Sequence, residues 1–312
     1  MNLQKNFAYA TKYGGKLGRG EHMYVRTDLA LEEKELWQKS ADEQTELSGV
    51  WAREYTRRGI KTTVVKILNA EGERKLHKPA GTYLTLELTA LAQRERDAFE
   101  RSVSALTEEL KRLTKGCSSI LVAGLGNDAV TPDAIGPQTL KNLIVTRHLK
   151  KAGSAGLDGF RCVSAVQPGV LGTTGVESVE LVRGAAEHAE PDLIVVVDAL
   201  AARSPERICT TVQLADTGIV PGSGVGNSRA AFSRETLGVP VIAVGVPTVV
   251  DARTFLSEHD GLCNFNNCIS GMVVTPRDID ARVREISRVI GYAIDLALHP
   301  GLAIEDVPCF LA

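Results

Sequence analysis

The sequence predicts an α/β protein: a mostly parallel sheet with helices on both faces, plus an N-terminal antiparallel β-meander. Short apolar runs without polar alternation are typical of strands buried on both faces of a sheet, and amphipathic stretches lie between them. Ahead of these runs, residues 49–89 hold β-type segments separated by turn residues. Because folding units commonly contain about 100 to 250 residues, the 312-residue chain fits one main domain, 29–312, preceded by an arm, 1–28.

The elements follow from these patterns in chain order. Residues 1–24 are aperiodic and glycine-rich, so we expect a flexible arm there. The runs GVWAREYTRR, GIKTTVVKIL and GTYLTLEL form the predicted meander, and a helix over about 92–115 follows because apolar residues recur every three or four positions. The core, 118–250, is predicted to alternate buried strands and covering helices. The strands are 118–124, 161–166, 192–198 and 239–246, and the helices are about 137–150 and 176–189.

A long helix is predicted near the end of the chain, at 275–299. Thr275 and Pro276 supply an N-cap and a first-turn signal for it. We expect one apolar stripe of this helix to face the core. The stripe consists of Ile279, Val283, Ile286, Ile290 and Ile294.

Composition narrows the classes of function. The net charge of −2 gives no general attraction to nucleic acid or anionic lipid, so we expect no direct nucleic-acid partner. The longest apolar runs, 193–197 and 239–246, are too short for a bilayer span of about 20 residues. The N-terminal region also lacks the apolar segment of a secretory signal. We therefore expect no membrane association and a cytoplasmic location.

The cysteines and histidines do not predict a metal site. None of the six cysteines belongs to a CxxC pair, which favours reduced thiols. Cys263 and Cys268 are close enough in sequence to raise a disulfide or a metal site, but no second ligand pair accompanies them. The six histidines have no mutual metal-ligand spacing, so no cofactor is expected.

Two aspartates fall where an open parallel sheet binds ligands, outside the carboxyl ends of its strands. Asp133 lies in GLGNDAVTPDAIGP, the loop after the first core strand, and Asp198 ends the apolar run of DLIVVVDALAAR. An acid that ends an apolar run is costly to bury unless it is paired or used. Helix capping or a hydrogen bond to a neighbouring loop explains either aspartate alone. Together, on adjacent loops of one crevice, they favour a site.

These two carboxylates predict acid–base chemistry. Two close carboxylates do not both ionise readily, so they tend to share one proton. The ionised member then activates water while the protonated member donates to a carbonyl oxygen, which is peptide hydrolysis without a metal or a covalent intermediate. The alternative is a divalent metal bound by Asp133 and Asp198, which requires a third ligand.

Other site motifs are weaker. GLGN lacks the third glycine of a dinucleotide loop, and the sequence contains no GxSxG or HExxH motif. The glycine-rich loop PGSGVGN lacks the lysine of a P-loop. Its glycines, Gly222, Gly224 and Gly226, are expected to let the backbone approach another loop or an extended peptide closely.

Several long motifs occur in one order from about residue 24 onward: GLGNDAVTPDAIGP, VTRHL, DGFR, PGVLGTTGVE, PDLIVVVDALAARSPER, DTGIVPGSGVGN, ETLGVPVIAVGVPTVVDA and MVVTPRDID. Together they resemble the spore germination proteases, the endopeptidases that degrade small acid-soluble spore proteins. The resemblance implies an atypical aspartic-type endopeptidase with a fold similar to the hydrogenase maturation proteases, and its two proposed catalytic aspartates fall on Asp133 and Asp198. It also implies a homotetramer in the forespore and spore core, made as an inactive zymogen with residues 1–28 as pro-segment.

The resemblance also implies a self-processing point. The family's substrates are cut after an acidic residue and before a large apolar one, and VRTDLALEE places Thr27 and Asp28 ahead of Leu29 in this pattern. We expect cleavage between Asp28 and Leu29, and a capped helix start at Thr27 or Asp28 is the alternative. Protonation of Asp28 and the aspartate pair weakens their repulsion, so acidification is the expected trigger. An acid before the cut also suggests a basic counter-group, for which spacing offers Arg147, Arg161 and Arg203.

Two features depart from the resemblance. Between Val250 and Met272 the chain is shorter than in bacillus-like members, and the arm before Tyr24 is longer than a standard pro-segment. A nucleotide- or peptide-binding regulator that kept the fold without turnover is the non-enzymatic alternative.

Overall fold

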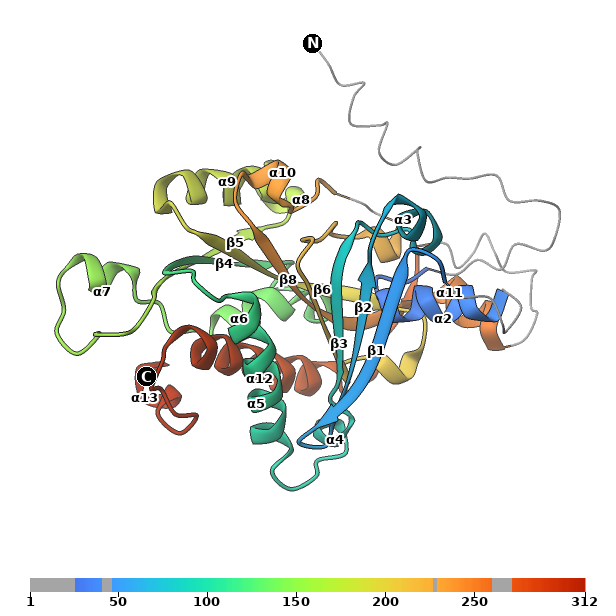
Figure 1. The fold of residues 1–312 in the computed structure, drawn as a ribbon, viewed down its shortest axis with the longest axis horizontal. Coiled ribbons are helices and arrows are strands. Elements are labelled where there is room, and N and C mark those ends of the chain that lie inside the picture. The colour runs from blue at the N-terminus through green and yellow to red at the C-terminus, as the bar shows by residue number, and fades with distance from the viewer. Residues whose placement is uncertain (1–25, 41–46, 227–228, 260–270, 312) are drawn as a thin grey trace, which may run out of the picture.

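The computed structural model describes residues 26–40, 47–226, 229–259 and 271–311. The strands of this part of the chain are β1 (Val50–Arg57), β2 (Ile60–Ile67), β3 (Gly81–Glu87), β4 (Ser119–Leu125), β5 (Cys162–Gly169), β6 (Leu193–Ala202), β7 (Thr211–Ala215), β8 (Val241–Asp251) and β9 (Val273–Val274). They form one mixed sheet in the order β1-β2-β3-β7-β8-β6-β4-β5, and β9 pairs with β8 beside this path (Figure 1).

Two halves of the sheet differ in strand direction. β5, β4, β6 and β8 run parallel to one another, and β7 pairs antiparallel with both β8 and β3. β3, β2 and β1 continue antiparallel, so the meander extends the core sheet through β7. The predicted α/β sheet with its meander is confirmed.

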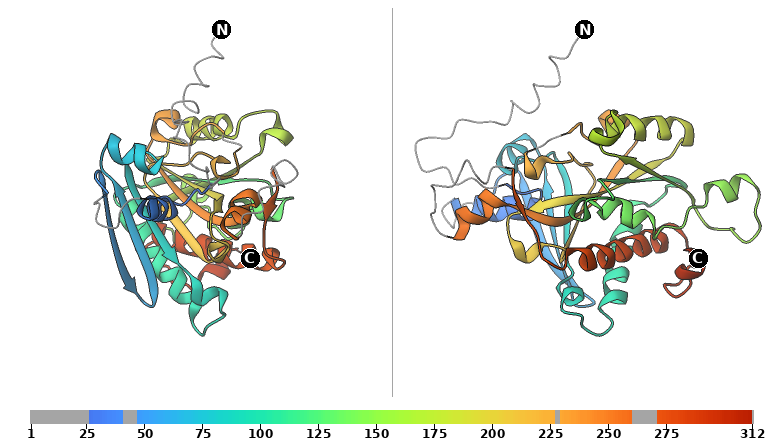
Figure 2. Two further views of the ribbon diagram at one scale, coloured as in Figure 1. Left: turned by 90° about the vertical axis from the view of Figure 1, so that its right-hand side faces the viewer. Right: turned by 180° about the vertical axis from the view of Figure 1, so that it is seen from behind.

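Helices cover both faces of the parallel half. The helices of the described residues are α2 (Ala30–Ser40), α3 (Ala70–Leu76), α4 (Thr89–Ala92), α5 (Ala98–Leu113), α6 (Ile135–Leu140), α7 (Arg147–Lys151), α8 (Leu171–Thr174), α9 (Ser178–Ala189), α10 (Arg234–Leu237), α11 (Ala252–His259), α12 (Ile279–Leu298) and α13 (Val307–Leu311), with 3-10 turns η1 (Thr131–Asp133), η2 (Pro205–Arg207) and η3 (Ser223–Val225). Figure 2, in its reverse view, places the red α12 and the yellow-green α9 on opposite sides of the sheet.

The sequence of the parallel strands follows from this covering. Ile120 of β4 and Val195 of β6 pack in the core cluster that holds the apolar residues of α5 and α12. The neighbouring Leu121 and Ile194 point to the other face and pack with the apolar residues of α9. Because both of their faces are buried, β4, β6 and β8 carry apolar residues at successive positions, which is why they show no alternation.

Helix α12 is apolar where the sequence predicted, but it begins later. The five residues of its predicted stripe are all buried. The N-cap position is Asp278, and the hydroxyl of Thr275 donates to the carbonyl oxygen of Thr248 (2.8 Å). The prediction of Thr275 as N-cap is therefore wrong, because this hydroxyl ties the end of β9 to β8 instead.

Two further elements differ from the sequence prediction. The helix predicted over 137–150 is divided into α6 and α7. The N–H of Ile144 donates to Asp295 Oδ1 (2.9 Å) and that of Thr146 donates to Val163 O (3.0 Å), so these groups bind α12 and β5 instead of continuing a helix. Strand β7 was not predicted, because its five residues, TVQLA, are too few to display a period.

Some predictions fall on residues outside this description. Cys263, Cys268 and the arm up to residue 25 lie outside the described residues. The described part of the chain contains Cys117, Cys162, Cys209 and Cys309, and these are free thiols. None of the helices described above is both long and apolar enough to cross a membrane.

Candidate active site

Asp198 is a buried acid near the carboxyl end of the parallel strands. It lies on β6, paired with Gly245 of β8, and is 4% exposed. The backbone N–H of Ala199 donates to its Oδ1 (2.9 Å). Burial raises the pKa of Asp198 well above its usual range, and the negative charges of Asp133 and Asp28 raise it further. This environment favours the protonated carboxyl group.

Asp133 reaches the same edge from η1, the turn that follows β4. Its carboxylate accepts a hydrogen bond from the N–H of Asn127 at Oδ2 (2.9 Å). The residue is half-buried, and burial raises its pKa, while the Asn127 hydrogen bond acts in the opposite direction. The rise is smaller than that of Asp198, which is more deeply buried and also feels the charges of two other acids. The structure thus brings Asp133 and Asp198 within electrostatic reach of each other.

Glycines hold the Asp133 loop against the sheet. Gly126 adopts φ +107°, and a Cβ atom there would overlap the carbonyl oxygen of Asp133. Gly136, at the start of α6, has no room for a side chain either, because a Cβ atom on it would overlap the backbone of Leu125. The glycines of GLGNDAVTPDAIGP therefore let the turn fold onto β4 and place its acid at the sheet edge.

Asp28 docks into this edge from the N-terminal segment. Its N–H donates to Ala201 O (2.9 Å), and Ala201 N–H donates to Asp28 Oδ2 (2.9 Å). The hydroxyl of Ser223 donates to Asp28 Oδ1 (2.5 Å). Gly224 lies so close that a Cβ atom on it would overlap Asp28 Oδ2. The glycine-rich loop thus packs on this chain's own residues around Asp28.

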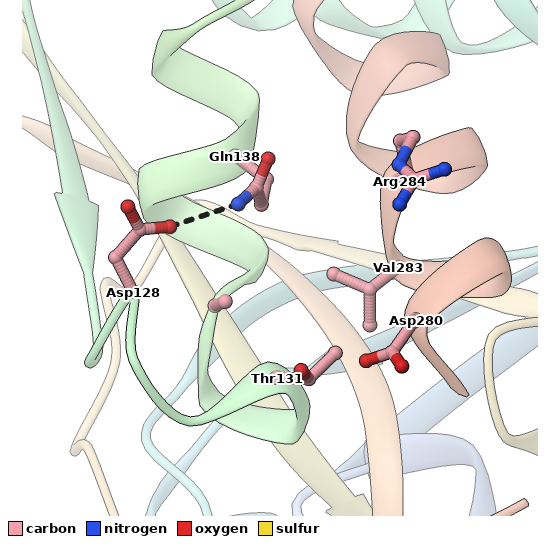
Figure 3. Close-up of a pocket in the computed structure, with 7 residues that line it drawn as sticks. Asp128, Thr131, Gln138, Asp280, Val283 and Arg284 are labelled. Carbon is pink, nitrogen blue, oxygen red and sulfur yellow. Dashed lines mark hydrogen bonds between the residues drawn. The ribbon is translucent and has the colours of Figure 1, made fainter. Parts of the chain in front are cut away.

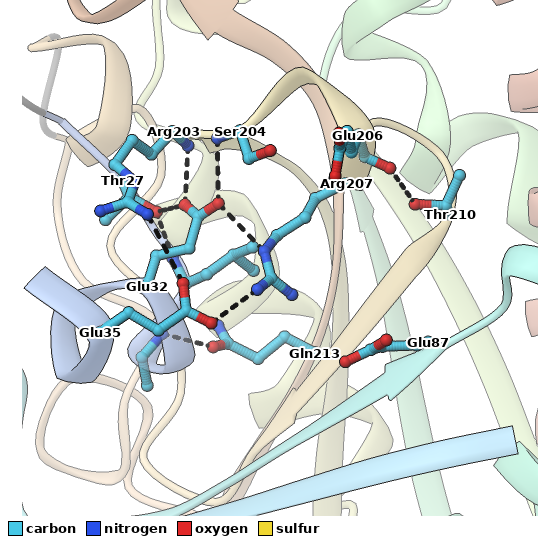
Figure 4. A network of polar contacts seen from close by, with 12 residues as sticks. Thr27, Glu32, Glu35, Glu87, Arg203, Ser204, Glu206, Arg207, Thr210 and Gln213 are labelled. Carbon is cyan, nitrogen blue, oxygen red and sulfur yellow. Dashed lines mark hydrogen bonds and ion pairs between the residues drawn. The ribbon is translucent and has the colours of Figure 1, made fainter. Parts of the chain in front are cut away.

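The residues after Asp28 are also bound. Leu29 is fully buried with Leu200 and Ala202. The carboxylate of Glu32 accepts from the N–H groups of Arg203 (2.6 Å) and Ser204 (3.0 Å) and pairs with Arg207 Nε (3.2 Å), as Figure 4 shows. Burial raises the pKa of Glu32 despite these contacts, which act in the opposite direction.

Gln213 of β7 contacts the chain on both sides of Leu29. Its Nε2 donates to the carbonyl oxygen of Asp28 (3.1 Å), and its Oε1 accepts from the N–H of Ala30 (2.8 Å). The side chain therefore spans the Asp28–Leu29 peptide bond, and Figure 4 places it beside α2.

The three candidate arginines lie in different places. Arg203 follows β6 at the aspartate edge, and its Nη2 is 3.6 Å from Glu35 Oε2. Arg161 precedes β5 and donates to Thr114 O (2.8 Å), while Arg147 donates to His188 O (3.0 Å). Both lie toward the amino ends of the parallel strands, so the structure does not bring them together with Asp133 and Asp198. Arg207, which sequence spacing did not single out, binds Glu32.

A separate hollow lies between the Asp133 loop and α12 (Figure 3). Its lining consists of Asp128, Thr131, Ala134, Gln138, Asp280, Val283 and Arg284. The carboxylate of Asp128 accepts from Gln138 Nε2 (2.8 Å) and Lys141 Nζ (2.9 Å). Neither Asp133 nor Asp198 lines this hollow, so it does not belong to the paired-aspartate site.

A divalent metal bound by Asp133 and Asp198 would require a third side-chain ligand. Among the described residues, no group of three or more His, Cys, Asp or Glu side chains is arranged to hold a metal ion. The third ligand that Asp133 and Asp198 would require is therefore not found in this part of the chain.

Sequence reasoning missed three residues of this site: Gln213, Ser223 and Arg207. Gln213 is the one long polar side chain in the buried run TVQLA, which is a signal that the sequence did offer. Ser223 lies between glycines that had been singled out for their backbone alone. Arg207 has no local pattern that separates it from a solvated arginine.

Comparison with known proteins gives consistent matches. The germination protease family model matches residues 27–262. The chain is 44% identical to a germination protease of Caldanaerobacter subterraneus, over 91% of this chain and 97% of the relative. The identity to a germination protease of Clostridium tetani is 38%, over 93% and 100%. To one of Bacillus pumilus it is 44%, over 75% of this chain and 66% of the relative.

A solved structure also matches part of the chain. A hydrogenase maturation protease from Thermococcus kodakarensis shares 18% identity with a TM-score of 0.35, covering 60% of this chain and 98% of that one. The family assignment comes from the sequence matches, which span most of the chain and nearly the full length of the first two relatives. The chain belongs to the germination protease family and is a protease.

Proposed function

We propose that this protease starts the degradation of small acid-soluble spore proteins during germination, and that it is made as a zymogen that cuts itself between Asp28 and Leu29. The observation that carries the proposal is the meeting of three acids at one sheet edge. The charge of Asp133 raises the pKa of Asp198 there, and so does the charge of Asp28, from the expected cleavage point.

In the proposed reaction, Asp133 is the general base and Asp198 the general acid, because the deeper burial of Asp198 favours its protonated form. Asp133 takes a proton from water as the water oxygen bonds to the carbonyl carbon of Asp28. The π electrons of that carbonyl move to its oxygen, which takes the proton of Asp198. The product of this step is a neutral tetrahedral diol.

The second step returns both aspartates to their starting states. Asp133 gives its proton to the nitrogen of Leu29 as the C–N bond breaks. One hydroxyl of the diol returns a proton to Asp198 as the C=O bond forms again. One water molecule is consumed, and the products are a carboxyl group on Asp28 and an amine on Leu29.

The docked segment supports the substrate class. Ser223 and the N–H of Ala201 would receive an acidic side chain before the cut, and Leu200 would contact an apolar one after it. The hydrogen bond from Asp28 N–H to the β6 backbone is of the kind that binds extended peptides. Proteins that are disordered when free can present such a segment without unfolding first.

The capped helix start and the cleavage point are compatible. Leu29 N–H donates to Thr27 Oγ1 (3.0 Å), and Glu33 N–H donates to Leu29 O (3.1 Å), so α2 begins directly after the proposed bond. The same residues would then serve as a helix start before cleavage and as a substrate motif during it.

Assembly and location complete the proposal. We propose a homotetramer in the spore core, supported by the resemblance to the germination proteases. Light scattering on the purified full chain measures the assembly, and a monomer at micromolar concentration would contradict it.

One assay tests the catalytic proposal. The purified full chain is incubated with a peptide that contains Thr-Glu-Phe-Ala, with and without a chelator, and fragments are identified by mass spectrometry. Asp133→Asn and Asp198→Asn should each abolish self-processing and peptide cleavage. Asp128→Asn is the matched control, because this loop acid binds Gln138 and Lys141 instead.

The outcomes separate the alternatives. Full activity in either aspartate variant excludes the paired-acid mechanism. Loss of activity with the chelator, restored by added metal, assigns the aspartates to a metal instead. A chain that releases no fragments under any condition is a binding protein without turnover.

A further inference from the structure

We propose that Gln213 binds the carbonyl oxygen of the peptide bond that is cut and stabilises the negative charge that develops on it. This inference rests on the proposed cleavage between Asp28 and Leu29. It assigns to β7 a catalytic residue in addition to the two aspartates.

The hydrogen bonds fix the orientation of the Gln213 amide. The backbone N–H of Ala30 can only donate, so the group that faces it must be the oxygen, Oε1 (2.8 Å). The amide nitrogen, Nε2, then faces the carbonyl oxygen of Asp28 (3.1 Å) and donates to it. Gln213 is 7% exposed, so these bonds form with little competition from water.

The strand register aligns Gln213 with Asp198. Gln213 of β7 is paired with Gly245 of β8, and Gly245 is paired with Asp198 of β6. Directly paired residues on neighbouring strands project from the same face of a sheet. The amide of Gln213 and the carboxyl group of Asp198 therefore rise from one face, on either side of a residue without a side chain.

This arrangement suits hydrolysis of the Asp28 carbonyl. A carbonyl oxygen has two lone pairs, so it can accept from Gln213 Nε2 while it receives the proton of Asp198. As water attacks, charge builds on this oxygen, and a donor already in place gains strength without reorganising. The second bond, to Ala30 N–H, holds the amide so that its nitrogen cannot turn away.

A purely structural role would give the same static contacts, so the test must separate the two. Gln213→Met keeps the length of the side chain but removes the donor. The contacts of Asp28 with Ser223 and Ala201 remain and should keep the segment docked. We expect the rate at which the full chain releases the fragment starting at Leu29 to fall about 100-fold, the usual loss for one such donor.

Gln213→Glu provides a readout that packing alone does not move. A protonated glutamic acid can donate to Asp28 O and accept from Ala30 N–H as glutamine does, whereas an ionised one repels the developing charge. The variant should therefore process itself at low pH and lose activity as its new acid ionises, with a profile unlike that of the wild type. Thr211→Val, two residues earlier on β7, is the control and should keep the wild-type rate.

Each outcome decides the inference. A Gln213→Met chain that processes itself at the wild-type rate overturns it, as does a Gln213→Glu chain with the wild-type pH profile. A rate loss matched by faster hydrogen exchange at residues 29–33 also overturns it, because Gln213 would then only hold the segment in place. If the wild type is not cut after Asp28, this inference and the proposed function both fail. If the wild type is cut and the Asp198→Asn variant is not, the proposed function stands, and the Gln213 variants alone decide this inference.

Discussion

Asp198 is placed where its burial works against the stability of the fold. Burial raises its pKa from the ordinary value of 3.8, and Asp133 and Asp28 add to the effect. A raised carboxyl pKa means that the folded state binds the proton more tightly than the unfolded state. The contribution of Asp198 to the free energy of unfolding is therefore fully present below the ordinary pKa and is lost as the pH rises toward the raised value.

Replacement of Asp198 by Asn should therefore stabilise the protein at neutral pH. Asparagine keeps an acceptor for Ala199 N–H and carries no charge. In a chain that already has Asp133→Asn, which should prevent the proposed cleavage, we expect Asp198→Asn to raise the thermal midpoint at pH 7 and to leave it nearly unchanged near pH 3.5, about the ordinary aspartate pKa. Calorimetry at both pH values measures this, and a lower midpoint at pH 7 contradicts it.

The same physics decided which site residues could be found from the sequence. Asp133 and Asp198 were chosen from the sequence because Asp198 ends an apolar run and Asp133 lies in the loop that follows another, near the sheet edge where ligands bind. Gln213 is marked in the sequence as a long polar residue in the run TVQLA, but its role, like that of Ser223, depends on which segments lie beside one another in the fold. Sequence spacing carries no such information for β7, which pairs with strands distant in the chain. Sequence spacing also singled out residues that the fold places elsewhere. Arg161 and Arg147 are close in sequence to core strands but lie toward the amino ends of those strands.

At the level of the elements, the β4–η1–α6 unit is a strand, a turn and a helix that nearly touch. Gly126 and Gly136 allow this contact, because each faces backbone atoms where other residues carry Cβ. The first glycines of the motif are spaced as in a dinucleotide loop, but they give room to the loop's own backbone. The glycines in the sequence could predict a tight turn, but not which atoms approach them closely.

A single methyl group at Gly126 should therefore displace Asp133. In Gly126→Ala, the positive φ and the overlap with Asp133 O both oppose the native turn, so we expect a loss of more than about 1 kcal/mol in stability and of most self-processing. Gly116→Ala is the control, because Gly116 also has a positive φ but its Cβ would meet no neighbour within 4 Å. Denaturant titration and the processing assay compare the two. Full activity in Gly126→Ala would contradict this account of the loop.

Across the whole molecule, the acids around the docked segment should couple the proposed self-processing to pH. Burial raises the pKa of Glu33 to about 7, and the charges of Glu32 and Asp28 contribute to this shift. Because this pKa is raised, the docked state binds a proton more tightly, so docking is favoured below the ordinary value of 4.5 and weakens as the pH rises through about 7.

Self-processing should accordingly be faster at mildly acidic pH than at pH 8, about one unit above the raised pKa. Protonation removes charge from Glu33, so the segment stays docked against Gln213. Glu33→Gln should flatten this dependence by raising the rate at the higher pH. The measurement is the rate of fragment release across the pH range. Equal rates of wild-type cleavage at neutral and mildly acidic pH would remove the idea.

Cleavage itself should then open the site. The cut would create a charged amino group on Leu29, which is fully buried in the intact chain and lies next to the first residue of α2. A positive charge is unfavourable both in an apolar environment and at the positive end of a helix. We therefore expect α2 to loosen and the groove around Gln213 and Ser223 to become available to other peptides. Hydrogen exchange can compare the self-processed wild type with uncut Asp133→Asn: the amides of residues 31–36 should exchange faster after cleavage, while those of β2 and β3 should not change. Equal protection of α2 in the two forms would mean that the new terminus keeps the groove closed, and that substrate must enter by another route.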